Sequence, residues 1–546
     1  MSIPLTRSYW PATDGERVRD LTLGDMLREA AVVVPERLAL VDGVADPMAR
    51  RTWTYSEFLR DAECAARALL QRFKPGDRIS IWAPNSADWI ILQQGISLAG
   101  MIMVAANPAY RSRELAHILS QSGAAGLFHV DSYRGTDLTA IIEELRPEVP
   151  ALSDVVSFSE FGEFLESGRR KEQELPAVAP TDPIQIQYTS GTTGFPKGAL
   201  LHHKGLVNEA HFVALRAGMA DGDVYINAMP MYHIGGGAVT SFGAVAMHGT
   251  FVIMPAFDPG LALELFETYR GTHSLLVPTM LVAVLDHPDR ASRDLSSLKT
   301  VMSGASAVPA ALVSRTIGLL GCRFSILFGQ TEMHGVISQT RITDSPSDQS
   351  NTVGRPLEQL EVKIADPVTH APVAIGTAGE ICCRGYQNML GYYNMPEETA
   401  SAIDDEGWLH MGDLGTMDER GFIRVTGRLK DMIIRGGLNI YPREIEELLV
   451  THPAVAGAAV VGIPDDVWGE QIAAVVEFRA GANATAEELR GFCRAEMSAH
   501  KTPSHWIFVG QLPVTPTGKV QKFLLRQQLA SGELVEVVLS SSTLTG

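Results

Sequence analysis

The sequence is poor in cysteine, and its few cysteines follow no recognisable pattern. Five occur in 546 residues, at positions 64, 322, 382, 383 and 493. They have neither the paired spacing of a metal site nor the density of a disulfide-stabilised scaffold. Cys382 and Cys383 lie in an apolar, strand-like stretch, where we expect buried packing. The cysteine content argues against a disulfide-rich secreted domain and predicts a cytoplasmic protein.

Long apolar runs and runs of positive charge are also missing. The longest apolar stretch, residues 89–106, is interrupted by glutamines, glycines and a serine, so we predict a buried helix and strand instead of a membrane span. The charged N-terminus lacks the apolar core of a signal peptide. The formal net charge is −18, which predicts no nucleic-acid partner. Peripheral membrane contact and a homodimer stay open.

What the chain does have is a short stretch dense in glycine, serine and threonine. Residues 188–198 read YTSGTTGFPKG, a series of hydroxyl and backbone N–H donors that ends in a cation and suits a polyphosphate. The common pattern G-x-x-x-x-G-K-[ST] is not matched, because Pro196 precedes the lysine and Gly198 follows it. β-prone residues flank the stretch, so we predict a loop between two strands. A glycine-rich surface turn is the alternative reading.

This stretch resembles the signature of the adenylate-forming superfamily, which contains acyl-CoA synthetases, aryl-CoA ligases, peptide-synthetase adenylation domains and firefly-type luciferases. The resemblance implies that ATP activates a carboxylate, giving an acyl-adenylate and pyrophosphate. It also implies that Lys197 neutralises phosphate charge during catalysis. The implied phosphate-binding residues are Thr189, Ser190, Gly191, Thr192, Thr193, Gly194 and Lys197.

Two later stretches resemble the superfamily's adenine and magnesium segments. The resemblance implies that Gly304, Ala305 and Ser306 pass along the adenine, where small residues suit a flat ring. In the stretch FGQTE, it implies that Phe328 stacks on the adenine in place of the usual tyrosine. Glu332 would act in catalysis by holding Mg²⁺, with Thr189 as a second ligand; a helix-capping acid is the alternative. The remaining nucleotide contacts would be Gly329, Gln330 and Thr331.

The acyl substrate is assigned to the stretch MPMYHIGGG. His233 resembles the superfamily histidine beside the reacting carboxylate, although a structural histidine is the ordinary alternative. We expect a strand that runs into a glycine-rich turn, in which the three glycines at 235–237 leave room for the acyl chain. Met229, Met231 and Tyr232 are candidate pocket walls.

The ribose and the hinge are assigned to residues further along the chain. Asp413 resembles the aspartate that accepts hydrogen bonds from the ribose hydroxyls, and Met411 stands where threonine is usual. The stretch 428–431 resembles the interdomain hinge. The resemblance implies that Arg428 reaches the nucleotide and that backbone torsions change at Lys430; a surface charge run is the alternative.

Two stretches near the C-terminus complete the resemblance. Gly436 and Gly437 match the loop that lines the pantetheine tunnel. Lys519, in the stretch VTPTGKVQK, matches the mobile adenylation lysine that bridges the carboxylate and the α-phosphate; a solvent-facing lysine is the alternative.

The length requires more than one domain, and helix and strand patterns alternate from about residue 22 to 123. We predict an α/β fold with a large N-terminal domain over residues 1–427, built from mixed parallel sheets covered by helices and from a small β-subdomain. Residues 131–180 would form a variable surface connection. A hinge at 428–431 would precede a small mobile α+β domain over 432–546.

The predicted activity is that of an ATP-dependent medium- or long-chain fatty acyl-CoA ligase, which uses ATP, Mg²⁺ and CoA. Alternatives are a fatty acyl-AMP ligase that loads a carrier protein, an aryl-CoA ligase, a luciferase-like oxidase, and a catalytically silent adenylate sensor. An amino-acid substrate is disfavoured, since no aspartate near Met231 could bind an ammonium group.

Overall fold

The computed structural model describes residues 4–12, 15–189, 196–435, 438–465, 467–514 and 520–537. Several residues that the sequence assigns to the site lie outside this part of the chain: Ser190, Gly191, Thr192, Thr193, Gly194, Gly436, Gly437 and Lys519.

The chain divides into two compact units. The larger unit comprises Trp10–Val362 and Cys383–His410, and the smaller comprises Met1–Tyr9, Lys363–Cys382 and Met411–Gly546. The limits predicted from sequence, at residues 427 and 431, stay a prediction. The α/β fold class is confirmed by the sheets and helices described below.

A mainly parallel sheet, here called the β12 sheet, forms one half of the larger unit. Its strands from β16 to β2 run parallel, which brings their carboxyl ends to one edge. In spatial order its strands are β18 Arg355–Pro356, β17 Ser338–Gln339, β16 Arg323–Phe328, β15 Thr300–Ser303, β14 His273–Leu275, β12 Val224–Asn227, β13 Thr250–Ile253, β2 Leu38–Asp42 and β3 Thr52–Thr54.

A second sheet of the larger unit, the β10 sheet, carries the predicted phosphate loop. Its strands β10, β5, β4, β6 and β9 are parallel, and β11 and β21 add an antiparallel edge. In spatial order its strands are β21 Gly391–Tyr392, β11 Lys197–His202, β10 Pro183–Thr189, β5 Ile102–Ala106, β4 Arg78–Trp82, β6 Gly126–His129 and β9 Asp154–Ser157.

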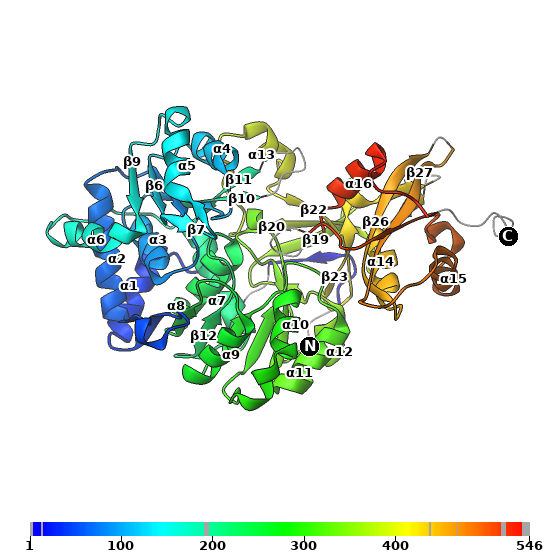
Figure 1. Ribbon diagram of the computed structural model, residues 1–546, viewed down its shortest axis with the longest axis horizontal. Helices are drawn as coiled ribbons and strands as arrows, with labels where there is room; N and C mark the ends of the chain where they lie inside the picture. The colour runs from blue at the N-terminus through cyan, green and yellow to red at the C-terminus, as the bar shows by residue number, and fades with distance from the viewer. Residues whose placement is uncertain are drawn as a thin grey trace. The chain divides into compact units, whose positions relative to one another are not determined.

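Helices cover both sheets. Figure 1 shows α4 and α5 on one side of β6 and β9, with α2 and α6 on the other. Leu115 of α4 and Ile142 of α5 pack in one apolar cluster with Leu127 of β6. The helices of the larger unit are α1 Leu23–Val33, α2 Tyr55–Leu70, α3 Ala87–Leu98, α4 Ser112–Ser122, α5 Leu138–Leu145, α6 Phe161–Arg169, α7 His203–Arg216, α8 Ser241–Ala246, α9 Pro259–Thr268, α10 Pro278–Asp286, α11 Ala310–Leu320, α12 Pro346–Asn351 and α13 Pro396–Ala402.

The smaller unit contains a mainly antiparallel sheet, with one parallel pair between β27 and β28 and an apolar core on each face. Its strands, in spatial order, are β25 Leu438–Ile440, β24 Ile433–Arg435, β27 Gly469–Phe478 and β26 Val455–Asp465, and β28 His505–Val509 also pairs with β27. Ile445 of α14 and Leu489 of α15 pack on one face, and Leu525 of α16 packs on the other. The helices are α14 Pro442–Val450, α15 Ala486–Glu496 and α16 Lys522–Ser531.

A further sheet holds most of the predicted β-subdomain. It runs in the order β1 Tyr9–Trp10, β19 Glu361–Ala365, β20 Gly379–Arg384, β22 Leu409–Met417 and β23 Ile423–Arg428. Cys382 and Cys383 are both buried in β20, as predicted, and the other three cysteines are buried as well.

A local prediction is wrong. Residues 131–180 do more than form a surface connection: α5, β9 and α6 lie there, and β9 extends the β10 sheet. The apolar spacing of α6 was hidden by the charged run that follows it.

No helix in the described part of the chain combines the length and the apolar character needed to cross a bilayer. This agrees with the prediction that residues 89–106 form a buried helix and strand, which are α3 and β5.

The contact of α6 with α2 gives a test of the packing. A Cβ on Gly168 would lie 1.9 Å from the Cys64 carbonyl oxygen, whereas a Cβ on Gly162 of the same helix would meet no atom within 4 Å. We expect Gly168→Ala to destabilise the fold by about 1–3 kcal/mol and to lower the melting temperature. Gly162→Ala is the matched control and should leave the melting temperature unchanged or raise it. Equal melting temperatures for the two variants would contradict this packing.

Candidate active site

The two strands predicted on either side of the phosphate loop are present, and the structure shows that they pair with each other. β10 and β11 are antiparallel, and Thr189 is opposite Lys197 in the register. The Thr189 hydroxyl oxygen lies 3.4 Å from the Lys197 carbonyl oxygen. The two ends of the loop are therefore fixed side by side, with a hydroxyl on one strand and an amine on the other.

Glu332 lies beside these two ends. Its Oε1 accepts a hydrogen bond from the Tyr392 hydroxyl at 2.8 Å and lies 3.3 Å from the Thr189 hydroxyl oxygen. The Lys197 ammonium lies 5.2 Å from the centroid of the Tyr392 ring, within cation–π range. A cation, a carboxylate and two hydroxyls thus meet at the carboxyl end of β10.

The turn that carries Glu332 is held by hydrogen bonds from several elements. The Met389 N–H donates to the Glu332 carbonyl at 2.9 Å. The Gln387 amide donates to the Met333 and Val336 carbonyls at 3.0 and 2.8 Å. On the other side, the Val336 N–H donates to Glu209 Oε1 at 3.1 Å. These contacts fix the carboxylate to a rigid support.

Glu209 is completely buried in α7, and burial raises its pKa well above the ordinary value. Burial therefore favours the neutral form of this acid. Gly335, with φ of 129°, comes close to it, because a Cβ at that glycine would lie 3.0 Å from Glu209 Oε1.

Buried histidines pack against the same turn and hydrogen-bond to the backbone around it. His334 Nδ1 donates to the Gln387 carbonyl at 2.7 Å, and its Nε2 accepts the His202 N–H at 3.0 Å. Burial lowers the pKa of His334 well below its ordinary value, and it lowers the pKa of His202 and His203 to about 4. These neutral imidazoles therefore act as structural hydrogen-bonding groups.

The predicted adenine residues follow adjacent parallel strands. β15 and β16 pair with Ser303 opposite Ile326, so Gly304 and Phe328 emerge at the same sheet edge. Gly304 is buried, and a Cβ there would lie 2.5 Å from the Leu327 carbonyl oxygen. Gly329 is equally confined, since its Cβ would lie 2.2 Å from the Gly335 carbonyl oxygen.

The remaining residues of these two segments lie at the same edge. Phe328 is half-buried, as are Gln330 and Thr331. Ala305 has a left-handed φ of 63°, uncommon for a residue with a side chain, and Ser306 next to it is half-buried. The structure therefore brings the two predicted adenine segments together.

The histidine segment differs from the prediction. The strand β12 ends at Asn227, and the glycines begin a π-helical stretch over Gly235–Thr240 that continues into α8. The Gly236 and Gly237 N–H groups donate to the His233 carbonyl, at 3.1 and 2.8 Å. The predicted turn is thus wrong, because the backbone N–H groups find helical partners immediately after His233.

Two of the three glycines are needed for backbone packing. A Cβ on Gly236 would lie 2.3 Å from the Pro230 carbonyl oxygen, and one on Gly237 would lie 2.2 Å from the Met231 carbonyl oxygen. At Gly235 the nearest atoms are side-chain carbons of Met229 and Leu275, at 3.4 and 3.7 Å. Only Gly235 of the three has room for a side chain.

The predicted pocket walls differ in exposure. Met231 is fully buried and Met229 is nearly so, whereas Tyr232 is half-buried. Asn85 binds this segment: its amide donates to the Met229 carbonyl at 3.0 Å, and its Oδ1 accepts the Met231 N–H at 2.8 Å. The next residue, Ser86, caps α3 by accepting the Trp89 N–H.

In the smaller unit, the predicted ribose and hinge residues form ion pairs. Asp413 on β22 is opposite Arg428 on β23, and Arg428 Nε lies 3.1 Å from Asp413 Oδ1. Asp431 pairs with Arg526 of α16 at 2.9 Å. Desolvation and the neighbouring Arg428 charge lower the pKa of Lys430. The buried Met411 side chain lies on β22, two residues before Asp413.

The described residues on either side of positions 515–519 have partners. Val514 and Val520 form an antiparallel bridge, and Lys522 Nζ lies 2.6 Å from Glu446 Oε1. Lys519 itself belongs to the residues outside the description, so its role stays a prediction.

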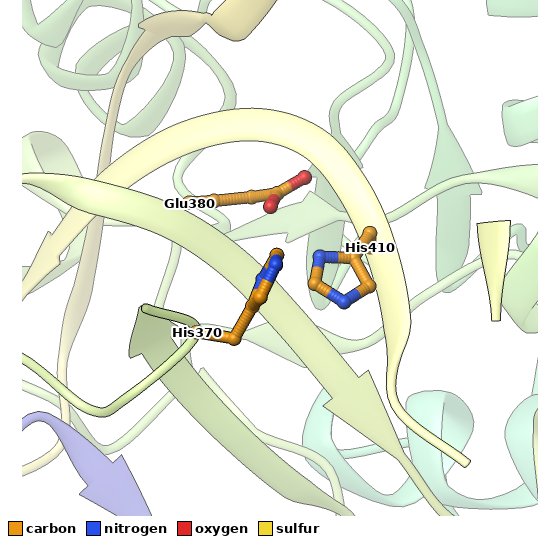
Figure 2. A group of neighbouring side chains, drawn as sticks. All are labelled: His370, Glu380 and His410. Carbon is orange, nitrogen blue, oxygen red and sulfur yellow. The ribbon is translucent and has the colours of Figure 1, made fainter. Parts of the chain in front are cut away.

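Figure 2 labels three further side chains of metal-binding types, His370, Glu380 and His410. The first two belong to the smaller unit and His410 to the larger. Glu380 Oε1 accepts the Gly412 N–H at 3.1 Å, and His410 Nε2 lies 3.4 Å from Asp404 Oδ2. No metal role is assigned to these residues.

The sequence reasoning missed Tyr392, Gln387 and Glu209, which all contact the Glu332 turn or its carboxylate. Tyr392 lies on β21, which pairs directly with β11, the strand that carries Lys197, and this pairing of segments far apart in the sequence left no signal in it. Gln387 and Glu209 gave none, because a single amide or acid in a sequence does not reveal its partner.

The buried histidines predict how stability depends on pH. His202 takes up a proton below about pH 6.5 when unfolded but only below about 4 when folded, so unfolding binds protons between these values. The free energy of unfolding should therefore fall as the pH falls through this window. His202→Asn keeps an acceptor for the Gly205 N–H and should reduce the slope between about pH 5 and 6, by at most ~1.4 kcal/mol per pH unit.

Urea denaturation at a series of pH values measures this slope. The exposed His500 provides the control, and His500→Asn should leave the slope as in the wild type. Identical slopes for both variants would show that His202 is not buried in its neutral form.

Comparisons with known proteins agree with the geometry. The model of the family described as AMP-binding enzyme matches residues 27–393, and that of the AMP-binding enzyme C-terminal domain matches residues 444–519. A putative acyl-CoA synthetase of Bacillus subtilis, YngI, is 37% identical over 93% of this chain and 97% of its own length. The mitochondrial medium-chain acyl-CoA ligase ACSF2 of Bos taurus is 35% identical over 96% of this chain and 90% of its own.

A solved structure extends the likeness to three dimensions. The ATP-bound MatB from Rhodopseudomonas palustris has a TM-score of 0.84 at 27% identity, and the match covers 93% of this chain and 99% of that one. The first family model alone spans more than half of the sequence. The chain therefore belongs to the AMP-binding enzyme family, the adenylate-forming superfamily that its motifs predicted, and it is an AMP-forming ligase.

Proposed function

We propose that the protein is an ATP-dependent acyl-CoA synthetase that activates a medium- or long-chain fatty acid. The observation that carries this proposal is the meeting of Lys197, Glu332 and Thr189 at the ends of β10 and β11. A triphosphate with its metal ion needs such a set of groups. The choice of a fatty acid is supported by the relatives named medium-chain acyl-CoA ligases.

The groups around Glu332 suit a magnesium ion. Glu332 and Thr189 offer hard oxygen atoms, and among the described residues Glu332 Oε2 has no hydrogen-bond partner. When bound, Mg²⁺ would neutralise charge on the phosphates of ATP.

In the first half-reaction, a carboxylate oxygen of the fatty acid attacks the α-phosphorus of ATP. The new oxygen–phosphorus bond forms as the bond to the bridging β-phosphate oxygen breaks, and pyrophosphate leaves. Lys197, together with Lys519 of the smaller unit, stabilises the charge that builds on the phosphates. The carboxylate is already a nucleophile, so no general base is needed.

The nucleoside would be held by the segments at the carboxyl edge of the β12 sheet. Phe328 would stack on the adenine beside the backbone of 304–306, with 329–331 along its other side. Asp413 would accept the ribose hydroxyls, and Arg428 would contact the nucleotide. His233 would lie beside the reacting carboxylate.

In the second half-reaction, the sulfur of CoA attacks the acyl carbonyl carbon. The carbon–oxygen bond to AMP breaks, and the thiol proton goes to solvent. A change of backbone torsions at Lys430 would reposition the smaller unit between the two halves, and Gly436 and Gly437 would give the pantetheine arm room along the backbone.

The acceptor and the acid can be identified in one assay. Purified protein with ATP, Mg²⁺ and free CoA should form an acyl-CoA thioester from medium- or long-chain fatty acids, and should release pyrophosphate faster with these than with benzoates or amino acids. Thioester formation only after a holo carrier protein is added would contradict the CoA assignment. Absence of pyrophosphate release with every carboxylate would favour a silent adenylate sensor.

The two half-reactions should depend on different residues. Lys519→Ala is expected to slow pyrophosphate release by roughly 10²–10³-fold while leaving the conversion of preformed acyl-adenylate to thioester within a few fold of wild type. Gly437→Leu should do the reverse, because its side chain would block the path of the thiol arm. The exposed Lys171→Ala is the control for both. Equal losses in the two half-reactions for Lys519→Ala would exclude its assigned role.

A further inference from the structure

Tyr392 contacts both charged groups of the candidate phosphate site, through different parts of its side chain. Its hydroxyl donates to Glu332 Oε1 at 2.8 Å, and its ring centroid lies 5.2 Å from Lys197 Nζ. The distance and the charge of the acceptor make the first contact a strong hydrogen bond. A phenol placed in this way is fixed relative to both the lysine and the carboxylate.

The backbone around Tyr392 is itself tightly held. β21 pairs with β11 so that Tyr392 is opposite Ala199, and the N–H groups of Leu390 and Tyr393 donate to carbonyls of β11. The Tyr392 N–H donates to the Thr399 hydroxyl of α13 at 2.9 Å. The preceding Gly391 has φ of 138°, and a Cβ there would lie 2.9 Å from Thr399. The ring thus has little freedom to move.

The two hydroxyls on Glu332 leave one side of its carboxylate for a ligand. Tyr392 and Thr189 both contact Oε1, while Oε2 has no hydrogen-bond partner in the part of the chain that the structure describes. Burial and the Glu332 charge raise the pKa of the Tyr392 hydroxyl, so it stays protonated and able to donate.

From this geometry we propose that Tyr392 is a positioning residue for the magnesium–triphosphate complex. Its hydroxyl orients the Glu332 carboxylate so that Oε2 faces the metal ion, and its ring restrains the Lys197 ammonium toward the phosphates. The inference rests on the function proposed above, and it adds a residue that links the metal-binding carboxylate to the phosphate-binding amine.

Two substitutions separate the roles of the hydroxyl and the ring. Tyr392→Phe removes the hydrogen bond to Glu332 and keeps the ring beneath Lys197, whereas Tyr392→Leu removes both. Tyr393→Phe is the matched control, because the neighbouring side chain packs against the apolar cluster of Ile102, Val104 and Ile186 instead.

The first readout is the rise in melting temperature that ATP causes, with and without Mg²⁺, each measured against the variant's own unliganded value. We expect the Mg²⁺-dependent part of the rise to shrink in Tyr392→Phe while the part seen with ATP and EDTA is kept. Both parts should shrink in Tyr392→Leu. A Mg²⁺-dependent rise equal to that of wild type in either variant would overturn the proposal, as would an equal loss in Tyr393→Phe.

The second readout is pyrophosphate release as a function of Mg²⁺ concentration. For Tyr392→Phe we expect the half-saturating Mg²⁺ concentration to increase roughly tenfold, the equivalent of one hydrogen bond to a charged group. Combined with Glu332→Gln, Tyr392→Phe should cause little further loss, whereas with Lys197→Ala the two losses should add. Additive losses with Glu332→Gln would contradict the proposal. If the wild-type protein were inactive with every acid, the proposed function would be refuted instead. The binding readout does not need that activity, so it tests the role of Tyr392 separately.

Discussion

The antiparallel pairing of β10 with β11 is the constraint on which the candidate site depends. It places Thr189 opposite Lys197, so both ends of a glycine-rich loop are fixed at one point of the β10 sheet. The carboxylate of the site, Glu332, lies next to these two residues. Glu332 reaches this point from the end of β16, and Tyr392 reaches it from the edge strand β21.

The support behind Glu332 is made of groups that carry no net charge. Burial favours the neutral form of each of them, because it lowers the pKa values of His334 and His202 and raises the pKa of Glu209. Each is a hydrogen-bonding group for the backbone of this region, and none competes electrostatically with a metal ion or a phosphate. A charged group buried at the same place would lose its hydration, which carries a large cost in free energy.

Much of the fold and the site could be predicted from the sequence. The phosphate-loop strands were predictable because β-prone residues flank a run that suits no regular structure, and α3 and β5 because polar interruptions exclude a membrane span. The π-helical stretch after His233 was not predictable, since three glycines favour a turn locally and only the packing of Gly236 and Gly237 on the preceding backbone decides otherwise. The contacts of Tyr392 and Glu209 join residues far apart in sequence and are set by topology alone.

The three glycines at 235–237 differ in the space available for a side chain, and this difference matters for any redesign of substrate preference. Methyl groups at Gly236 and Gly237 would collide with main-chain atoms, which cannot retreat without unravelling the segment before the helix. At Gly235 an added group would meet only side-chain carbons of Met229 and Leu275, and the methionine can adopt another rotamer. Substitutions meant to reshape the proposed acyl site should therefore start at Gly235, because libraries that randomise all three positions would consist mostly of variants with a clash against the backbone at Gly236 or Gly237.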